Sequence, residues 1–307
     1  MIDISVVIPV FRTSVFIEEL ATRLQLVLNG LVNEYEIIFI DDGSPDQSWM
    51  LIDDLAKRNP QIRGLKLSRN FGQHSAISAG LLNASGKWVV VMDGDLQDMP
   101  EDIPELYRVA MSGTDSVLAR RSTRDDGVLK KVNSRIFYKV FAKLTGSTLT
   151  HEYGNFGIYS RKVINSINQM PENERSFGLF AEWVGFKRSE ILVNRAKREH
   201  GPSSYSYLSL IRLASKSIVS YSNKPLYVVT TVGFLIFVIS ISFASVLLAR
   251  YLIFGVQAQG WTSLMVAIFL NSGLIIGTLG ILGIYIGSIF SEVKRRPQFV
   301  IDLDTQA

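Results

Sequence analysis

Two aspartates separated by one glycine, Asp93 and Asp95, directly follow the apolar stretch 89–92, which is typical of a buried strand. Clustered carboxylates repel one another and are costly to desolvate unless a cation lies beside them. Carboxylate and amide oxygens, here those of Asp95 and Gln97, are ligands that Mg²⁺ or Mn²⁺ accepts when water and a diphosphate fill the other positions. Gly94 leaves room for a closely approaching ligand. The spacing predicts a site for a divalent ion and a phosphate.

A second apolar stretch, residues 37–40, also ends in acids, Asp41 and Asp42. One of them could accept hydrogen bonds from a nucleobase or a ribose. Capping of the next helix is the alternative role, and Asp46 or Ser44 would suffice for it.

Alternating strand and helix patterns must position these acids. Strands are predicted over 4–10, 36–40, 64–67, 87–92 and 116–118, and helices over 15–28, 47–57, 75–82 and 103–111. This alternation predicts an α/β fold with a doubly wound, mostly parallel sheet. Such sheets bind ligands at the carboxyl ends of their strands, where Pro9, Asp41 and Asp93 fall.

The amino-acid composition limits the kinds of metal site that the chain can form. The 307 residues include no cysteine, and the three histidines are too scattered for a zinc motif, so any metal should be a hard, oxygen-liganded ion. An apolar content of 47% and a mean hydropathy of +0.21 indicate that part of the chain meets lipid. The N-terminus shows no signal-peptide pattern, so the first part is expected to stay in the cytoplasm.

Basic residues gather in one stretch with few acids. They are Arg120, Arg121, Arg124, Lys130, Lys131, Arg135, Lys139 and Lys143. The stretch contains no recognised nucleic-acid-binding motif, so we expect no nucleic-acid partner. Attraction to anionic lipid headgroups or phosphates is the simpler interpretation.

The last third of the chain is patterned for a membrane. Residues 207–221 fit an interfacial amphipathic helix, with an ordinary surface helix as the alternative. No charged residue occurs between Lys224 and Arg250, or over 251–291, which predicts transmembrane helices near 226–248 and 264–290. A buried soluble hairpin is the alternative. The basic residues outside both spans predict that both ends face the cytoplasm.

Five glycines punctuate the second predicted span. They are Gly273, Gly277, Gly280, Gly283 and Gly287. Small residues at such spacing let helix backbones approach closely. Packing against the first span and homo-oligomerisation both remain open.

Several short motifs follow one another in a characteristic order along the chain. They are Val7-Ile8-Pro9-Val10, Asp41-Asp42-Gly43-Ser44, Arg69-Asn70-Phe71-Gly72, Gly86 before Asp93-Gly94-Asp95-Leu96-Gln97, and Lys294-Arg295-Arg296-Pro297. Together they resemble the family 2 glycosyltransferases that act on polyprenyl phosphates, such as bactoprenol glucosyltransferases, dolichyl-phosphate mannose synthases and undecaprenyl-phosphate formamido-arabinose transferases. The resemblance covers nearly the whole chain. It implies a GT-A fold, a nucleotide-sugar donor, expected to be UDP-linked, and a lipid-phosphate acceptor.

The resemblance also implies roles for individual residues. Pro9 and Asp41 would line the nucleotide, Asp93 would contact the donor, and Asp95 with Gln97 would hold Mg²⁺ or Mn²⁺. By the same resemblance, the expected catalytic residues are Asp93, Asp95 and Asn155, and the expected nucleotide-sugar contacts are Pro9, Asp41, Asp93, Arg120, Arg121, Arg198 and Ser204.

Three positions depart from the family pattern. Arg12-Thr13 stands where relatives commonly show Asn-Glu, which puts base recognition in doubt. Ser204 stands where many relatives carry a lysine, so one phosphate-binding cation is either missing or supplied by Arg198. Asn155 replaces the usual acid and cannot be a general base. An attacking phosphomonoester, with a second pKa of about 6, is already largely ionised at neutral pH.

The expectation is therefore a membrane-anchored inverting glycosyltransferase of the bacterial inner membrane that serves envelope glycan synthesis. We expect a cytoplasmic catalytic domain over 1–205, an interfacial helix over 206–224, two spans within 225–291 and a cytoplasmic tail over 292–307. A processive polysaccharide synthase is an alternative, although no Gln-x-x-Arg-Trp segment follows the catalytic region. A non-catalytic membrane scaffold or nucleotide-sugar sensor is another.

Overall fold

The computed structural model describes residues 1–121, 153–173, 175–193, 222–254 and 260–306. These residues form two compact units. One contains the described residues up to 193 together with 296–306, and the other contains those between 222 and 295. The predicted interfacial helix over 206–224 lies almost wholly outside the described residues, as does the basic stretch beyond residue 121.

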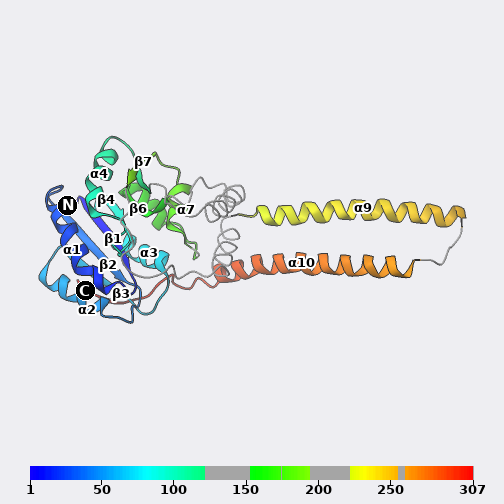
Figure 1. The fold of residues 1–307 in the computed structure, drawn as a ribbon, viewed down its shortest axis with the longest axis horizontal. Coiled ribbons are helices and arrows are strands. Elements are labelled where there is room, and N and C mark those ends of the chain that lie inside the picture. The colour runs from blue at the N-terminus through cyan, green and yellow to red at the C-terminus, as the bar shows by residue number, and fades with distance from the viewer. Residues whose placement is uncertain (122–152, 174, 194–221, 255–259, 307) are drawn as a thin grey trace. The chain divides into compact units, whose positions relative to one another are not determined.

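The first unit is built on a β-sheet (Figure 1). Within the described residues this sheet has eight strands in the order β7-β5-β6-β4-β1-β2-β3-β8. The strands are β1 (Ile4–Val10), β2 (Tyr35–Asp41), β3 (Ile62–Leu67), β4 (Trp88–Val91), β5 (Ser116–Arg121), β6 (Tyr153–Ser160), β7 (Arg188–Val193) and β8 (Ile301–Asp304). The strands β1 to β4 pair in parallel, as do β5 and β7. Only β6 and β8 pair antiparallel to their neighbours among these strands.

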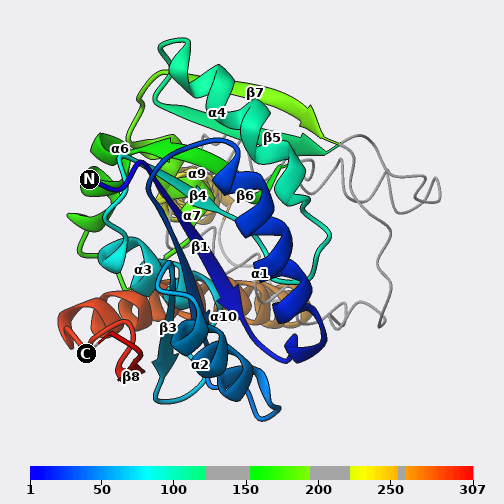
Figure 2. The ribbon, with the colours of Figure 1, turned by 90° about the vertical axis from the view of Figure 1, so that its left-hand side faces the viewer.

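Helices cover both faces of this sheet, which confirms the predicted doubly wound fold. On one face lie α1 (Ser14–Asn29), α2 (Ser48–Arg58) and α4 (Ile103–Met111), which follows the 3₁₀ turn η1 (Pro100–Asp102) (Figure 2). On the other face α3 (Gln73–Asn83), α6 (Arg161–Asn168) and α7 (Phe177–Trp183) pack together. The helix α1 buries an apolar stripe at helical spacing, made of Ile17, Leu20, Ala21, Leu24 and Leu28, whereas α3 buries the continuous run 76–81.

The strand order reverses beside β1. The chain moves from β1 to β2 and β3 on one side and then returns to place β4 on the other side of β1. In open α/β sheets the crevice at such a reversal, outside the carboxyl ends of the strands, is where ligands bind. Because β4 ends at Val91 and β1 at Val10, the turn with Asp93 and Asp95 lies at this crevice.

The C-terminal residues supply an edge strand that the sequence did not predict. Residues 292–307 were expected to form a tail, but Ile301–Asp304 pairs antiparallel with β3 as β8. Arg63 on β3 donates through Nε and Nη2 to the two carboxylate oxygens of Asp304, at 3.0 and 2.6 Å. Gly64 N–H donates to Thr305 Oγ1 at 2.9 Å. The end of the chain is thereby part of the sheet.

The Arg63–Asp304 pair predicts an acid-sensitive contribution to stability. The two side chains are only 18% and 16% exposed, and hydrogen bonding by Arg63 holds the pKa of Asp304 below its ordinary value of 3.8. A lowered pKa in the folded state stabilises the fold above pH 3.8, and this stabilisation is lost as the pH falls through the lowered value. Asp304→Asn should lower the free energy of unfolding by about 2 kcal/mol at pH 7.

Thermal unfolding in detergent from pH 7 to pH 3 measures this effect. The difference in Tm between the wild type and Asp304→Asn should be constant above about pH 5 and shrink below pH 4. The control is Asp53→Asn, which removes an exposed partner of Lys57 on α2. A Tm difference that does not change with pH would contradict the assignment.

A buried carboxylate joins β2 to the chain before β4, at the amino ends of the strands. Glu36, 8% exposed, accepts hydrogen bonds from Ser5 Oγ (2.6 Å), Ser85 N (2.7 Å) and Ser85 Oγ (2.7 Å), all at Oε1. Ser5 Oγ also accepts from Gly86 N at 2.7 Å. A Cβ at Gly86 would lie 2.6 Å from Ser5 N, so the close approach requires glycine.

Glu36→Ala should therefore destabilise the first unit by about 3 kcal/mol, because Ser5 Oγ and the two donors of Ser85 lose a buried acceptor. Chemical or thermal denaturation of the full chain measures the loss. Glu105→Ala, which removes a solvent-exposed partner of Arg108, is the control and should change stability little. Equal effects of the two substitutions would refute the structural role of Glu36.

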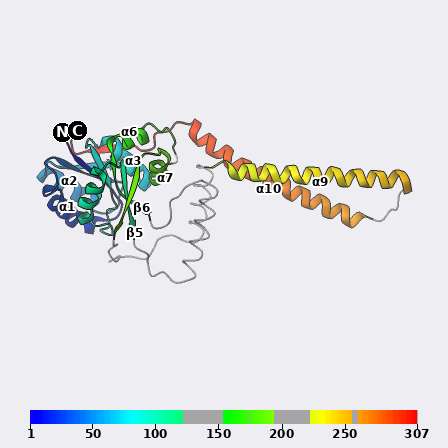
Figure 3. The same cartoon turned by 90° about the horizontal axis from the view of Figure 1, so that it is seen from above.

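The second unit contains two long apolar helices, α9 (Lys224–Phe254) and α10 (Trp261–Val293) (Figures 1 and 3). By length and composition, Lys224–Phe243 and Leu270–Val293 are each apolar enough to cross a membrane. Large apolar side chains on both helices are exposed, for example Phe234 (63%) and Ile276 (69%). A Cβ at any of the five α10 glycines would meet no described atom within 4 Å. Their role in oligomerisation remains a prediction.

Candidate active site

Two loops meet at the carboxyl ends of β1 and β2. The backbone N–H of Arg12, a non-glycine residue at φ 56°, donates to Ser44 Oγ at 3.2 Å. The N–H of Ser14 donates to Asp46 Oδ2 at 3.3 Å. A positive φ is uncommon for arginine and costs conformational energy, so these contacts hold the β1–α1 loop in a specific shape. Pro9 is buried in β1 just before this loop.

Asp41 at the end of β2 keeps one oxygen without a partner. The residue is fully buried, and its Oδ1 accepts from Ser44 N–H at 3.0 Å, while Oδ2 has no hydrogen-bond partner within the described part of the chain. Burial raises the pKa of this carboxyl, and hydrogen bonds from Ser44 oppose the rise. Buried polar atoms are normally satisfied, so the unpaired oxygen is suited to accept from a ligand N–H or hydroxyl.

Asp42 has a different role, which the sequence could not separate from that of Asp41. Its two carboxylate oxygens accept from the backbone N–H groups of Phe71 (2.7 Å) and Gly72 (2.9 Å). Burial raises its pKa, and these two bonds oppose the rise. Gly43, at φ 66°, approaches so closely that a Cβ would lie 2.6 Å from Arg69 C. Asp42 is therefore a structural acid that fixes the β3–α3 loop.

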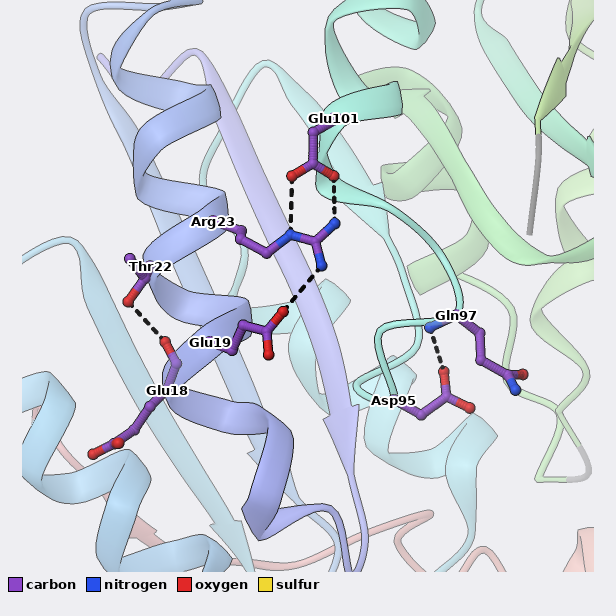
Figure 4. Close-up of polar contacts among 7 residues, drawn as sticks. All are labelled: Glu18, Glu19, Thr22, Arg23, Asp95, Gln97 and Glu101. Atoms are coloured by element: carbon purple, nitrogen blue, oxygen red, sulfur yellow. Dashed lines mark hydrogen bonds and ion pairs between the residues drawn. The ribbon is translucent and has the colours of Figure 1, made fainter. Parts of the chain in front are cut away.

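The turn after β4 packs against the end of β1. A Cβ at Gly94 would lie 3.3 Å from Pro9 O, so a larger residue would crowd β1 at this point. Leu96 adopts a positive φ of 56°, and Gln97 N–H donates to Asp95 Oδ1 at 3.1 Å (Figure 4). The turn is thus closed by its own aspartate, and it carries both predicted metal ligands.

The residues present fit a divalent ion that is shared with a ligand. Asp95 is half-buried, and Gln97 is 3% exposed with an amide nitrogen that lacks a partner within the described residues. Among those same residues, no three His, Asp or Glu side chains gather closely enough to hold an ion alone. Mg²⁺ is commonly held by one or two carboxylates together with substrate phosphates and water. One carboxylate and one amide match that arrangement.

Asp93 accepts hydrogen bonds from side-chain amides of two other elements. Gln73 Nε2, on α3, donates to Asp93 Oδ1 at 2.7 Å. Asn155 Nδ2, on β6, donates to the same oxygen at 3.5 Å. The structure therefore brings Asn155 and Asp93 together, although they are 62 positions apart in the chain. Sequence analysis did not single out Gln73, for which the available signal was its position directly after the Arg69-Asn70-Phe71-Gly72 motif.

The predicted phosphate-binding cations are the least defined part of the site. Arg120 on β5 forms an ion pair with Glu190 on β7 at 3.2 Å, and both side chains are 44% exposed. Only the backbone of Arg121 is described. Arg198 and Ser204 lie outside the described residues. Their expected contacts stay predictions.

A third unpaired polar atom lies at the same edge of the sheet. Thr13 Oγ1 is buried without a partner in the described residues, as are Asp41 Oδ2 and Gln97 Nε2. It lies 3.7 Å from the position of a Cβ at Gly94, which places it beside the metal-binding turn. Unpaired buried atoms on three neighbouring loops indicate a polar ligand that fits between them.

Comparison with known proteins identifies the class. The family model of glycosyl transferase family 2 matches residues 5–167, which include the ends of β1, β2 and β4 with Asp41, Asp93 and Asp95. The chain therefore belongs to glycosyl transferase family 2. It is 39% identical over 302 residues to an uncharacterised glycosyltransferase of Synechocystis, covering 98% of this chain and 95% of that one.

Two further relatives carry more specific names. A prophage-derived bactoprenol glucosyl transferase of Shigella flexneri is 36% identical, with 97% of each chain covered. An undecaprenyl-phosphate 4-deoxy-4-formamido-L-arabinose transferase of Photorhabdus laumondii is 34% identical, covering 97% of this chain and 93% of that one. Both agree with the resemblance found in the sequence motifs.

Solved structures confirm the GT-A fold. Glucosyl-3-phosphoglycerate synthase of Mycobacterium tuberculosis, in complex with Mn²⁺, UDP-glucose and phosphoglyceric acid, superposes with a TM-score of 0.52. The match covers 71% of this chain and 77% of that one at 20% identity. The GT-A architecture that the motifs implied is therefore present.

Proposed function

We propose that this protein is an inverting glycosyltransferase that moves one sugar from a nucleotide-sugar donor to a polyprenyl phosphate. The observation that carries the proposal is the convergence of an unpaired buried oxygen of Asp41 and the turn with Asp93 and Asp95 on one crevice. This arrangement suits a nucleotide at Asp41 and a diphosphate at Asp95. The names of the bactoprenol and undecaprenyl-phosphate relatives support the lipid acceptor.

The acceptor needs no general base in this mechanism. A phosphomonoester with a second pKa of about 6 already carries an ionised oxygen at neutral pH. Asn155, whose amide donates to Asp93, has no basic atom with which to take a proton. The protein therefore contributes position: it holds the anomeric carbon in line between the attacking phosphate oxygen and the departing diphosphate. One C–O bond forms as the sugar–diphosphate bond breaks, which inverts the anomeric centre.

The leaving group is stabilised at the turn after β4. Asp95 and Gln97 would hold Mg²⁺ or Mn²⁺, which when bound offsets the charge that develops on the departing nucleoside diphosphate. Asp93 contacts the donor sugar in this proposal, and Asp41 accepts a hydrogen bond from the nucleoside. Gly94 keeps the turn close enough to β1 for these groups to act on one ligand.

The membrane assignment rests on α9 and α10. Both helices expose apolar side chains along their length, and such surfaces are unfavourable in water and suited to lipid. Lys224 is the first residue of α9 and Lys294-Arg295-Arg296 follow α10, so the positive-inside rule favours a cytoplasmic catalytic unit. We propose the bacterial inner membrane, with undecaprenyl phosphate as the acceptor for envelope glycans.

The test is transfer by the purified full chain in lipid nanodiscs. Undecaprenyl phosphate is incubated with each of a panel of labelled nucleotide sugars, UDP-glucose first, with Mg²⁺ or Mn²⁺. We expect a lipid that carries a single sugar whose anomeric configuration is opposite to that of the donor. A long polymer would indicate the processive synthase instead. The absence of transfer from every donor would overturn the proposal and favour the sensor.

A further inference from the structure

Gln73 is the feature of the crevice that no role yet explains. It is the first residue of α3, and its amide donates to Asp93 Oδ1 at 2.7 Å, the shorter of the two amide contacts to that oxygen. The contact joins residues 20 positions apart, from a helix start and a strand end. Gln73 is itself exposed, so its contact with Asp93 does not result from burial in the core.

The fold holds Gln73 in place through Asp42. Asp42 accepts from the N–H groups of Phe71 and Gly72, the two residues before Gln73. Gly72 adopts φ 99°, a conformation that L residues rarely reach, and this turns the chain into α3. A buried carboxylate and a left-handed glycine therefore fix where the Gln73 side chain begins.

In the contact between Gln73 and Asp93, the amide is the hydrogen-bond donor and the carboxylate is the acceptor. A glutamine amide nitrogen only donates, so it pairs with an acceptor oxygen of Asp93 and restricts the rotation of that side chain. Asn155 donates to the same oxygen from β6. A carboxylate in place of either amide would repel Asp93 at this distance.

We propose that Gln73 is a positioning residue for Asp93: its amide, with that of Asn155, orients the carboxylate that receives the donor sugar. This inference rests on the proposed function, in which Asp93 contacts the sugar. It predicts that substitutions of Gln73 change the binding of the sugar part of the donor and do not change the binding of the nucleotide part.

Two substitutions separate this role from a structural one. Gln73→Ala removes the donor, and Gln73→Glu keeps the size of the side chain but replaces the donor by a charge of the wrong sign. If Gln73 positions Asp93, Gln73→Glu should lower kcat/KM more than Gln73→Ala does. If Gln73 only fills space at the start of α3, the isosteric Glu should be the milder change.

The experiment measures kcat and KM for the labelled donor, and Kd for UDP-glucose and for UDP alone, on the full chain with Mg²⁺. Gln73→Ala should lower kcat/KM about tenfold, the cost of one hydrogen bond to a charged group. Gln73→Glu should lower it further. The Kd for UDP should stay within twofold of the wild type in both variants, while that for UDP-glucose rises.

The matched controls are Gln25→Ala and Gln25→Glu. Gln25 Nε2 also donates an amide hydrogen bond, to Asn59 Oδ1 at 3.0 Å, away from the crevice. Both controls should keep wild-type kcat/KM, and Tm reports folding for all variants. If the wild type transfers its sugar but Gln73→Ala matches it, or Gln73→Glu is milder than Gln73→Ala, the positioning role is wrong. If the wild type transfers no sugar, the proposed function fails, and the UDP-glucose and UDP affinities decide the role of Gln73 alone.

Discussion

Replacing Asp95 by asparagine is expected to lower the rate of sugar transfer by about a hundredfold or more. Asp95 is the only carboxylate that we assign to the metal, and its Oδ1 also accepts the Gln97 N–H that closes the turn. Asparagine keeps the size of the side chain and an acceptor oxygen but removes the charge that attracts a divalent ion. The loss should therefore fall on kcat and on the metal requirement, because leaving-group stabilisation matters most in the transition state.

The measurement is initial transfer rate against Mn²⁺ concentration, together with Mn²⁺ binding in the presence of UDP by electron paramagnetic resonance. We expect Asp95→Asn to need a much higher Mn²⁺ concentration for half-maximal rate. Asp53→Asn, on the exposed side of α2, removes the same charge away from the crevice and should behave as wild type. Unchanged Mn²⁺ binding in Asp95→Asn would show that the metal, if used, is held elsewhere.

Asp41→Asn should weaken binding of the nucleotide by about ten- to a hundredfold, the range for a lost hydrogen bond to a charged group. The reason is the unpaired Oδ2, which an amide nitrogen replaces with a donor. The affinity for UDP alone should fall with that for the nucleotide sugar, since Asp41 is assigned to the nucleoside. The Gln73 variants differ from this pattern in one respect, since they should keep the wild-type affinity for UDP alone. Calorimetric titration of UDP and UDP-glucose distinguishes them.

The same substitution should not destabilise the fold. Burial raises the pKa of Asp41, so the ionised carboxylate costs folding free energy at every pH above its ordinary value of 3.8. Asparagine removes that cost, and the Tm of Asp41→Asn at pH 7 should equal or exceed that of the wild type. Asp42→Asn is the adjacent comparison. It places an amide against the N–H groups of Phe71 and Gly72 and should lower Tm.

A fall in Tm for Asp41→Asn with unchanged UDP affinity would assign Asp41 to the structure rather than to the ligand. That result would return it to the capping role that the sequence left open. Asp41→Asn and Asp42→Asn are therefore controls for each other. Both residues are buried and have a raised pKa, but only Asp42 has a hydrogen-bond donor at each of its two carboxylate oxygens within the described residues.

The periodic part of the fold was predictable from the sequence. The strand over 4–10 and the helix over 103–111 have the predicted bounds. The other predicted strands and helices in this part of the chain agree to within two residues at each end, except that β5 continues three residues beyond the predicted 116–118, to Arg121. Each of these elements buries one apolar stripe or a continuous apolar run, and such periodicity is local information. The two apolar helices were predicted near 226–248 and 264–290, and α9 and α10 extend beyond these bounds at both ends.

The candidate site was predictable only where acids follow a strand. The crevice at Asp41, Asp93 and Asp95 follows from strand ends and parallel pairing. Strand β8 was missed because its four residues, although they alternate apolar and acidic side chains, are too few to identify a strand and gain order from pairing with β3. The position of Arg120 was predicted, but its pairing with Glu190 depends on β5 lying beside β7, which are 67 or more residues apart.

The sequence by itself determined which residue types stand at the carboxyl ends of the strands, and with them the class of chemistry and the family. Only the tertiary structure decided which atoms are still available for a ligand. Asp41 and Asp42 are the same residue type at adjacent positions, yet one keeps an unpaired oxygen and the other binds two backbone N–H groups. Gln73 reaches Asp93 only because the fold brings the start of α3 to the turn after β4. Hydrogen-bond satisfaction is a property of neighbours in space, and those neighbours come from distant parts of the chain.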